Sequence, residues 1–184
     1  MATAGVRLLR NLASSVAVLA VILFVAWGLP AINRLVPAGH DTIGGKAYAV
    51  GAGVVVVPPE QAEIDPSKTR PGTDRGTVLF LVGPVRYVIV VAPFVGALSD
   101  AAGKLREKIT GTRGYQVTGA DDPVTTAGGL NGLQGSYSAP GRLGRYAVFL
   151  SKGRSIEVTV SGAQSELANQ MAGIEASIAS IEQR

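Results

Sequence analysis

One uncharged stretch constrains this chain more than any other feature of its sequence. Residues 12–32 read LASSVAVLAVILFVAWGLPAI and contain no charged side chain. About 20 apolar residues in an α-helix span the ~30 Å hydrocarbon core of a bilayer, and Trp27 stands where an indole ring favours the interface. Arg7 and Arg10 precede the stretch, whereas only Arg34 follows it closely. This excess of positive charge predicts that the N-terminal side lies in the cytoplasm and the rest of the chain outside.

The stretch divides the sequence into four predicted segments. They are a cytoplasmic tail (residues 1–11), a transmembrane helix (12–32), a juxtamembrane linker (33–45) and an extracytoplasmic domain (46–184). A cleaved signal peptide is the alternative, since residues 36–38 offer a small-residue cleavage site. However, the apolar stretch exceeds the roughly 7–15 residues of a signal-peptide core, and Arg34 lies between it and that site. We therefore expect an uncleaved, single-pass anchor in a bacterial inner membrane.

A second hydrophobic stretch, residues 77–98, is long enough to cross a bilayer but differs in composition. Arg86 stands near its middle, where insertion of an arginine costs about 2.5–3.5 kcal/mol. Gly83 and Pro84 interrupt the stretch, and Val, Ile, Tyr and Phe dominate it, as in strands. We expect two buried strands here, with a second membrane span as the alternative.

The remaining pattern predicts an α+β fold, a mainly antiparallel sheet packed by two helices after the N-terminal transmembrane helix. The expected elements are a bulged strand at 46–57, an exposed loop at 58–76, a helix at 97–108, a short strand at 115–117, strand signals at 124–137, a hairpin of 146–150 with 156–160, and a helix at 163–182. In the hairpin, the apolar side chains of its two strands point to different faces, and Glu157 and Thr159 are expected to face solvent.

The last predicted helix has one apolar stripe. Its side chains recur at steps of four and three residues: Leu167, Met171, Ile174, Ile178 and Ile181. Ser161 and Gln164 resemble a capping box at its start. The stripe is expected to cover the sheet; a coiled-coil partner helix is the alternative, although two heptads are short for one.

Charge and composition exclude several classes of function. The chain has 17 basic and 13 acidic residues, but from residue 35 onward the counts are 14 and 13, so no basic face for nucleic acid is indicated. The absence of cysteine excludes disulfides and zinc–thiolate sites, and His40 is the only histidine. Asp121 and Asp122 are interpreted as a solvated turn before Pro123, since nothing in the sequence supplies a second convergent carboxylate.

Other polar clusters have equally ordinary interpretations. The glycines of residues 128–132 (GGLNG) and Gly135 lack the lysine and Ser/Thr of a phosphate-binding loop, so turns and bulges explain them better. Lys104, Arg106, Glu107 and Lys108 are interpreted as a solvated helix face. We therefore predict no catalytic residue, no metal site and no cofactor, and a protein that is not an enzyme.

The C-terminal segment carries a resemblance to a known superfamily. Residues 115–162 read YQVTGADDPVTTAGGLNGLQGSYSAPGRLGRYAVFLSKGRSIEVTVSG, and a helix with regularly spaced isoleucines, ending SIASIEQR, follows. This glycine-interrupted strand, hairpin and helix resemble the PsbP-like α/β/α sandwich superfamily over residues 46–183. That superfamily includes the LpqN-type lipoproteins of mycobacteria. The resemblance implies a binding or assembly factor rather than an enzyme, although this chain lacks the lipidated cysteine of LpqN-type proteins.

These features together predict an accessory or assembly subunit of a bacterial cell-envelope membrane complex, such as a lipid-transport (Mce-type) or secretion machine. The Ala-, Gly-, Val- and Arg-rich composition is typical of a high-GC bacterium such as an actinobacterium. Ala13, Ala17 and Ala20 place small side chains near one stripe of the anchor helix, where a membrane partner can approach closely. The alternative function is an extracytoplasmic module that binds a lipid or a small ligand.

Overall fold

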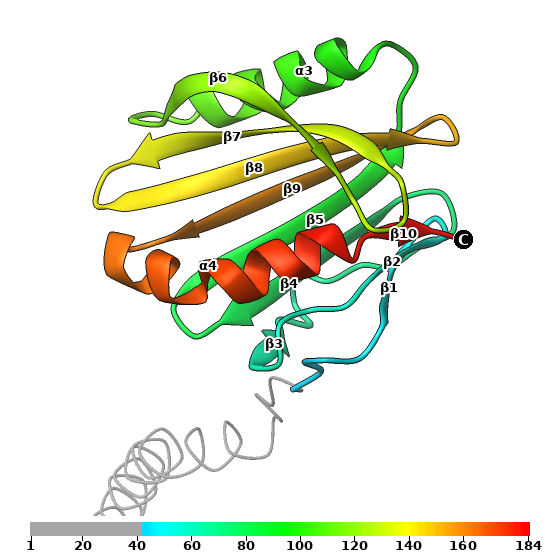
Figure 1. The fold of residues 1–184 in the computed structure, drawn as a ribbon, viewed down its shortest axis with the longest axis horizontal. Coiled ribbons are helices and arrows are strands. Elements are labelled where there is room, and N and C mark those ends of the chain that lie inside the picture. Colours follow the sequence, from blue (N-terminus) through cyan, green and yellow to red (C-terminus); the bar gives the residue numbers. More distant parts are fainter. Residues whose placement is uncertain (1–41) are drawn as a thin grey trace, which may run out of the picture. The chain divides into compact units, whose positions relative to one another are not determined.

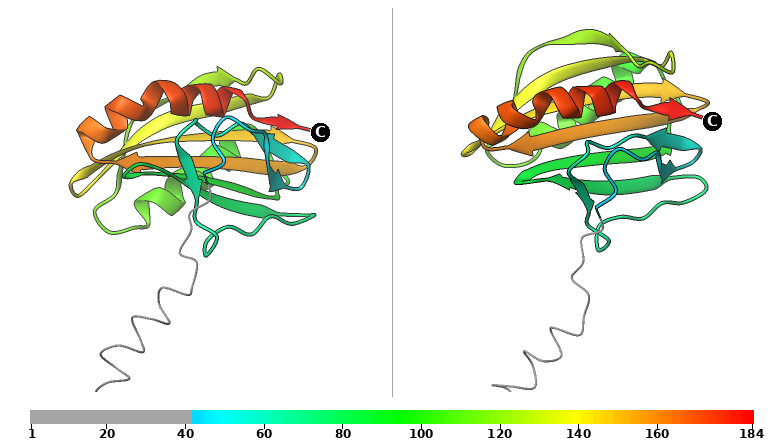
Figure 2. Two further views of the ribbon diagram at one scale, coloured as in Figure 1. Left: turned by 90° about the horizontal axis from the view of Figure 1, so that it is seen from below. Right: turned by 60° about the horizontal axis from the view of Figure 1, so that its bottom comes forward.

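The computed structural model describes residues 42–184, which form a seven-stranded sheet with helices on both faces (Figures 1 and 2). The strand order is β3-β4-β5-β9-β8-β7-β6, and every neighbouring pair is antiparallel. The strands are β3 (Ala62–Ile64), β4 (Gly76–Val82), β5 (Val85–Pro93), β6 (Gln116–Thr125), β7 (Asn131–Ala139), β8 (Arg142–Ser151) and β9 (Arg154–Gly162).

Two helices and a small second sheet complete the described part of the chain. They are α3 (Leu98–Thr110), α4 (Gln164–Ala179), and the sheet of β1 (Tyr48–Gly51), β2 (Val54–Val56) and β10 (Glu182–Gln183). Helix α3 packs over β6, β7 and β8 on one face, and α4 lies on the other face with the small sheet. The left view of Figure 2 shows the two helices on opposite sides of the sheet.

The second hydrophobic stretch forms strands β4 and β5, as predicted, with a turn at Gly83 and Pro84. Val85, Tyr87, Ile89 and Val91 of β5 are fully buried on the α4 face, while the alternate side chains are partly or wholly exposed. The alternative of a second membrane-spanning helix is therefore wrong for this stretch. Within residues 42–184, no helix is long and apolar enough to cross a membrane.

The sheet separates two hydrophobic clusters. The cluster on the α4 face is the larger one, and its bulkiest fully buried side chains are Phe80, Tyr87, Ile89, Phe149, Ile156, Ile174 and Ile181. The cluster on the α3 face consists of Ala101, Ala102, Leu105, Ile109, Tyr137, Tyr146 and Val148. Strand β8 contributes to both, because its successive side chains point to opposite faces. The predicted hairpin of β8 and β9 is thus confirmed, together with the division of its apolar side chains between two faces.

Helix α4 buries its predicted stripe against the sheet, with Ile174 fully buried and Ile178 only 9% exposed. The coiled-coil alternative is wrong for these side chains, because they already belong to the core of the domain. The helix ends at Ala179, and Ile181 is buried in the segment that leads into β10. The predicted capping box is also wrong: the N-cap is Ala163, and no side chain caps the helix.

The segment before β4 differs from its prediction. Residues 46–57 form a hairpin of β1 and β2 rather than one bulged strand, because Gly51, Ala52 and Gly53 all have positive φ and reverse the chain. The loop predicted at residues 58–76 contains β3, whose Ala62 is fully buried. Its later part runs along β4 through the bridge of Arg70 with Thr77.

The predicted anchor and its surroundings lie outside the described residues. This applies to the tail at residues 1–11, the transmembrane helix at 12–32, the docking face at Ala13, Ala17 and Ala20, and His40. These features remain predictions from the sequence.

Candidate functional site

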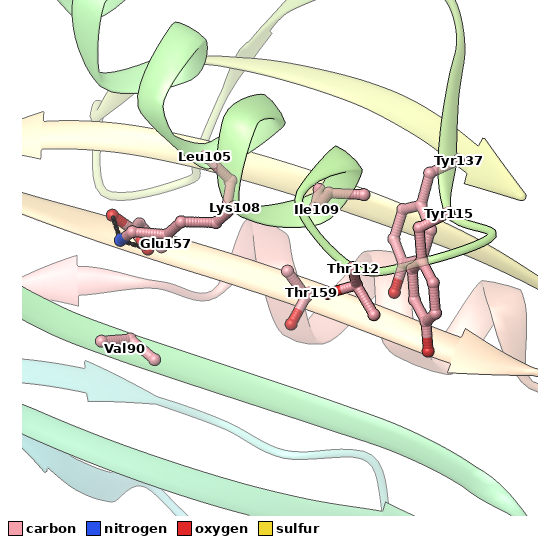
Figure 3. Close-up of a pocket in the computed structure, with 9 residues that line it drawn as sticks. All are labelled: Val90, Leu105, Lys108, Ile109, Thr112, Tyr115, Tyr137, Glu157 and Thr159. Carbon is pink, nitrogen blue, oxygen red and sulfur yellow. Dashed lines mark hydrogen bonds and ion pairs between the residues drawn. The ribbon is translucent and has the colours of Figure 1, made fainter. Parts of the chain in front are cut away.

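A groove runs beside α3 on the face of the sheet opposite α4. We call it the α3 groove; its volume is about 280 Å³. It is lined by Val90, Leu105, Lys108, Ile109, Thr112, Tyr115, Tyr137, Glu157 and Thr159 (Figure 3). One charged pair lies at one end and two tyrosines at the other, with threonine side chains between them. The groove therefore combines apolar, aromatic and polar groups within one surface.

Helix α3 forms the wall of the groove, and both of its ends are capped. The Ala97 N–H donates to the Asp100 carboxylate at 3.0 Å, and Gly111 is the C-cap. Ala101, Leu105 and their apolar neighbours on the helix bury its inner side against the sheet. The helix is thus a fixed wall rather than a loop laid over the strands.

Two lysines on the exposed side of α3 also contact groups outside the helix. The Lys108 Nζ lies 2.8 Å from both carboxylate oxygens of Glu157 on β9, and Glu157 is only 12% exposed. Lys104 Nζ lies 4.9 Å from the centroid of the Phe94 ring. Lys104, Glu107 and Lys108 are exposed, as the solvated-face prediction expects, although Lys104 and Lys108 also make these contacts. The prediction that Glu157 faces solvent is wrong. Sequence spacing carries no signal for these pairs, because their members are far apart in the chain or meet only after folding.

Two stacked tyrosines form the other end of the groove. The ring centroids of Tyr115 and Tyr137 are 5.9 Å apart, with 21° between the ring planes. The Tyr137 hydroxyl donates to the Val160 carbonyl at 3.0 Å, and burial raises the pKa of Tyr137. Tyr137 stands directly across from Gly144 of β8, where a Cβ would lie 2.1 Å from the tyrosine ring. The glycine thus makes the space that the ring occupies.

Asp121 is part of an interaction that fastens β6 and α3 to the sheet. It lies within β6, not in a turn, and its side chain is 11% exposed. Its carboxylate accepts a hydrogen bond from the Tyr146 hydroxyl and lies 3.0 Å from the Arg106 guanidinium. Burial, reinforced by Asp121, raises the pKa of Tyr146 to about 12. The solvated-turn prediction is wrong for Asp121, whereas Asp122 is exposed. Arg106, predicted on a solvated helix face, is 42% exposed and also forms this ion pair.

The glycines of β7 have a packing role that the turn interpretation missed. Gly135 faces Tyr146 across the strands, and a Cβ there would lie 2.4 Å from the tyrosine hydroxyl oxygen. Gly132 faces Phe149 in the same way. The turn interpretation holds for Gly129, which has φ +78° between β6 and β7. Each β7 glycine therefore admits an aromatic ring from β8.

The side chains that line the α3 groove can bind a ligand or a partner. Its two charged side chains pair with each other, and its hydroxyls belong to threonine and tyrosine. Within residues 42–184, no three His, Asp or Glu side chains lie close enough together to hold a metal ion. The groove offers hydrogen bonds, an aromatic surface and an apolar floor to a ligand or a partner.

Comparison with known proteins adds information on the fold. No protein-family model matches the chain, and no curated protein matches it in sequence. Among solved structures, cyanobacterial PsbP (CyanoP) from Synechocystis is 14% identical, with a TM-score of 0.56 over 80% of this chain and 96% of that one. The fold is PsbP-like. At this identity the likeness concerns the fold alone.

Two other solved structures are similar to a lesser degree. LpqN, involved in cell envelope biogenesis of Mycobacterium tuberculosis, is 14% identical with a TM-score of 0.48, over 70% of this chain and 82% of that one. A structure from Bacteroides thetaiotaomicron is 13% identical with a TM-score of 0.41, over 76% of this chain and 48% of that one. The mainly antiparallel sheet with two helices expected from the sequence is confirmed, and so is its PsbP-like character.

Proposed function

We propose that this chain is a non-enzymatic, single-pass membrane accessory subunit of a bacterial cell-envelope complex, and that its PsbP-like domain docks to a protein partner through the α3 face. In this proposal residues 12–32 anchor the chain in the inner membrane, and the domain lies outside the cytoplasm. The partner is an integral-membrane complex such as a lipid-transport (Mce-type) or secretion machine.

The observation that carries the docking proposal is the incomplete cover of the α3 face. Helix α3 packs over β6, β7 and β8 and reaches β9 through the Lys108–Glu157 pair, whereas its packing contacts do not extend over β4 and β5. The half-buried side chains there, which we call the open strand surface, are Thr77, Leu81, Val88, Val90 and Ala92. Val90 also lines the α3 groove, so surface and groove are continuous. Contiguous, partly exposed apolar side chains rimmed by polar groups are typical of interaction sites.

The non-enzymatic part of the proposal is supported by the pairing within the groove. Lys108 and Glu157 neutralise each other, and the Tyr137 hydroxyl donates its hydrogen bond to the Val160 backbone carbonyl. A general acid or base needs a titratable group free to exchange a proton with a substrate. The groups that line this groove instead stiffen its walls, which suits a surface that must be preformed for docking.

Affinity purification of the tagged full chain from membranes in mild detergent tests this function. We expect a stoichiometric membrane partner, identified by mass spectrometry, and its loss on Val88→Lys, which places a charge on the open strand surface. Val57→Lys is the matched control, because Val57 is 37% exposed and lies outside the α3 face. Recovery of the chain alone in several detergents, or an unchanged partner with Val88→Lys, would contradict the proposal.

A second candidate function is a small-ligand-binding module, and the α3 groove favours it. Stacked tyrosines beside threonine hydroxyls can hold a ligand that has both an apolar and a polar part. Organic extraction of the purified full chain, followed by mass spectrometry, checks this candidate. A bound small molecule that is lost with Tyr115→Ala supports it, and an empty extract rejects it.

A further inference from the structure

The α4 face of the sheet carries a second pocket, larger than the α3 groove. Its volume is about 430 Å³, within the roughly 300–1,000 Å³ of typical ligand pockets. We call it the α4 pocket; it is lined by Thr118, Ser136, Tyr137, Leu143, Gly144, Arg145, Gln164, Leu167, Ala168 and Met171. It lies between the N-terminal half of α4 and strands β6, β7 and β8. This pocket plays no part in the function proposed above.

A row of three hydrogen-bond donors crosses the strands of the pocket. Thr118 of β6 pairs with Ser136 of β7, and Ser136 pairs with Arg145 of β8. Directly opposed residues have Cβ atoms about 4.5–5.5 Å apart and point to the same face. The side chains of Thr118, Ser136 and Arg145 therefore extend from adjacent positions on the α4 face. A guanidinium next to hydroxyl donors matches a carboxylate, which accepts several hydrogen bonds at once.

The opposite side of the pocket is apolar. Leu167 and Met171 of α4 pack against the core of the domain, and the exposed Ala168 also lines the pocket. Leu143 of β8 adds an aliphatic side chain that is 40% exposed. Leu143 is among the large hydrophobic side chains that the described chain leaves exposed. Methionine and leucine side chains adapt to flexible aliphatic groups. The pocket therefore joins an aliphatic wall to one positively charged end.

We propose that the α4 pocket binds a fatty acid. The aliphatic chain lies against Leu143, Leu167 and Met171. The carboxylate binds the Arg145 guanidinium and accepts a hydrogen bond from the Ser136 hydroxyl.

Glu175 occupies the position that the ligand carboxylate takes in this proposal. Its Oε1 lies 2.7 Å from the Arg145 guanidinium, and the two side chains are 57% and 37% exposed. An ion pair so exposed contributes little to stability, so a ligand carboxylate can replace Glu175 at low cost. The two charges therefore have opposite effects on the affinity for the fatty acid. Removing the Arg145 charge lowers this affinity, and removing the Glu175 charge raises it. Adventitious binding to an apolar surface gives neither effect.

Photocrosslinking of the full chain in membranes with a diazirine-bearing palmitate tests the proposal. We expect labelled peptides to map to residues 142–145 and 167–171 and unlabelled palmitate to compete. Ala168→Trp fills the pocket and should lower labelling about tenfold, whereas the control Ala172→Trp, at an exposed position outside the lining, should not. Arg145→Gln should also lower labelling about tenfold, and Glu175→Gln should raise it severalfold.

Three results would overturn the proposal. They are labelling that maps outside the pocket, labelling that is insensitive to Ala168→Trp, and equal labelling by the matching diazirine-bearing fatty alcohol, which lacks the carboxylate. The recovery of a membrane partner is measured separately with Val88→Lys on the opposite face of the sheet. Failure of one proposal is therefore distinguishable from failure of the other.

Discussion

The two faces of the sheet are built by different means. On the α4 face, fully buried aliphatic and aromatic side chains of the strands meet α4 and the small sheet in one continuous core. On the α3 face, a smaller apolar cluster is supplemented by specific polar contacts, those of Lys108 with Glu157 and of Arg106 and Tyr146 with Asp121. Burial of apolar side chains stabilises the α4 face. On the α3 face, polar contacts fix the position of a helix that leaves part of the sheet uncovered. The α3 face is therefore the part of the domain better suited to contact a partner.

The largest expected effect comes from truncating one helix side chain on each face. Ile174 of α4 is fully buried, and Leu105 of α3 is 3% exposed but lines the groove. We expect Ile174→Ala to lower the free energy of unfolding by about 4 kcal/mol and Leu105→Ala by about 2 kcal/mol, because the wall of an open groove can relax into the space left. Urea unfolding of both variants measures the difference. Equal losses would show that the two faces do not differ in this way.

Glycine substitution on the α3 face should have the next largest effect. In Gly144→Ala the new methyl group would meet the Tyr137 ring, so the free energy of unfolding should fall by about 1–3 kcal/mol. Gly103→Ala in α3 is the control, since a Cβ there meets nothing within 4 Å, and it should stabilise by about 0.5–1 kcal/mol. Thermal unfolding of both variants gives the signs. A neutral Gly144→Ala would mean that the ring is not confined by its opposing strand.

Removing the charge of Asp121 should loosen the α3 face while leaving the α4 face intact. Asp121→Asn keeps an acceptor for the Tyr146 hydroxyl but loses the pair with Arg106, at a cost of about 1 kcal/mol. Hydrogen exchange should speed up in α3 and β6 but not in α4. The adjacent, exposed Asp122→Asn should change neither. Faster exchange throughout the domain would indicate that the faces unfold together.

These differences explain what the sequence could and could not reveal. The alternation of apolar side chains along β5 and the apolar stripe of α4 could be predicted, because buried side chains recur with the period of a strand or a helix. The contact of Asp121 with Tyr146 and that of Lys108 with Glu157 were not, because each joins residues distant in sequence through a geometry that only the folded sheet creates. The β7 glycines were interpreted as turns for the same reason. They make room for the Phe149 and Tyr146 rings of β8, which are distant in the sequence.

The smallest expected effect is confined to alkaline pH. Burial and Asp121 raise the pKa of Tyr146 from 10.0 to about 12, so the folded state holds this proton more tightly than the unfolded state. Its contribution to stability is complete below pH 10 and is lost as the pH rises toward 12. The Tm of the wild type should therefore fall as the pH rises from 10 to 12, and the Tm of Tyr146→Phe should fall less over the same range. Tyr87 on the α4 face is fully buried and its pKa is raised still further, so its effect begins in the same range but extends to higher pH. If the pH dependence of Tm is unchanged in Tyr146→Phe but reduced in Tyr87→Phe, the alkaline sensitivity belongs to the α4 face and not to the α3 face.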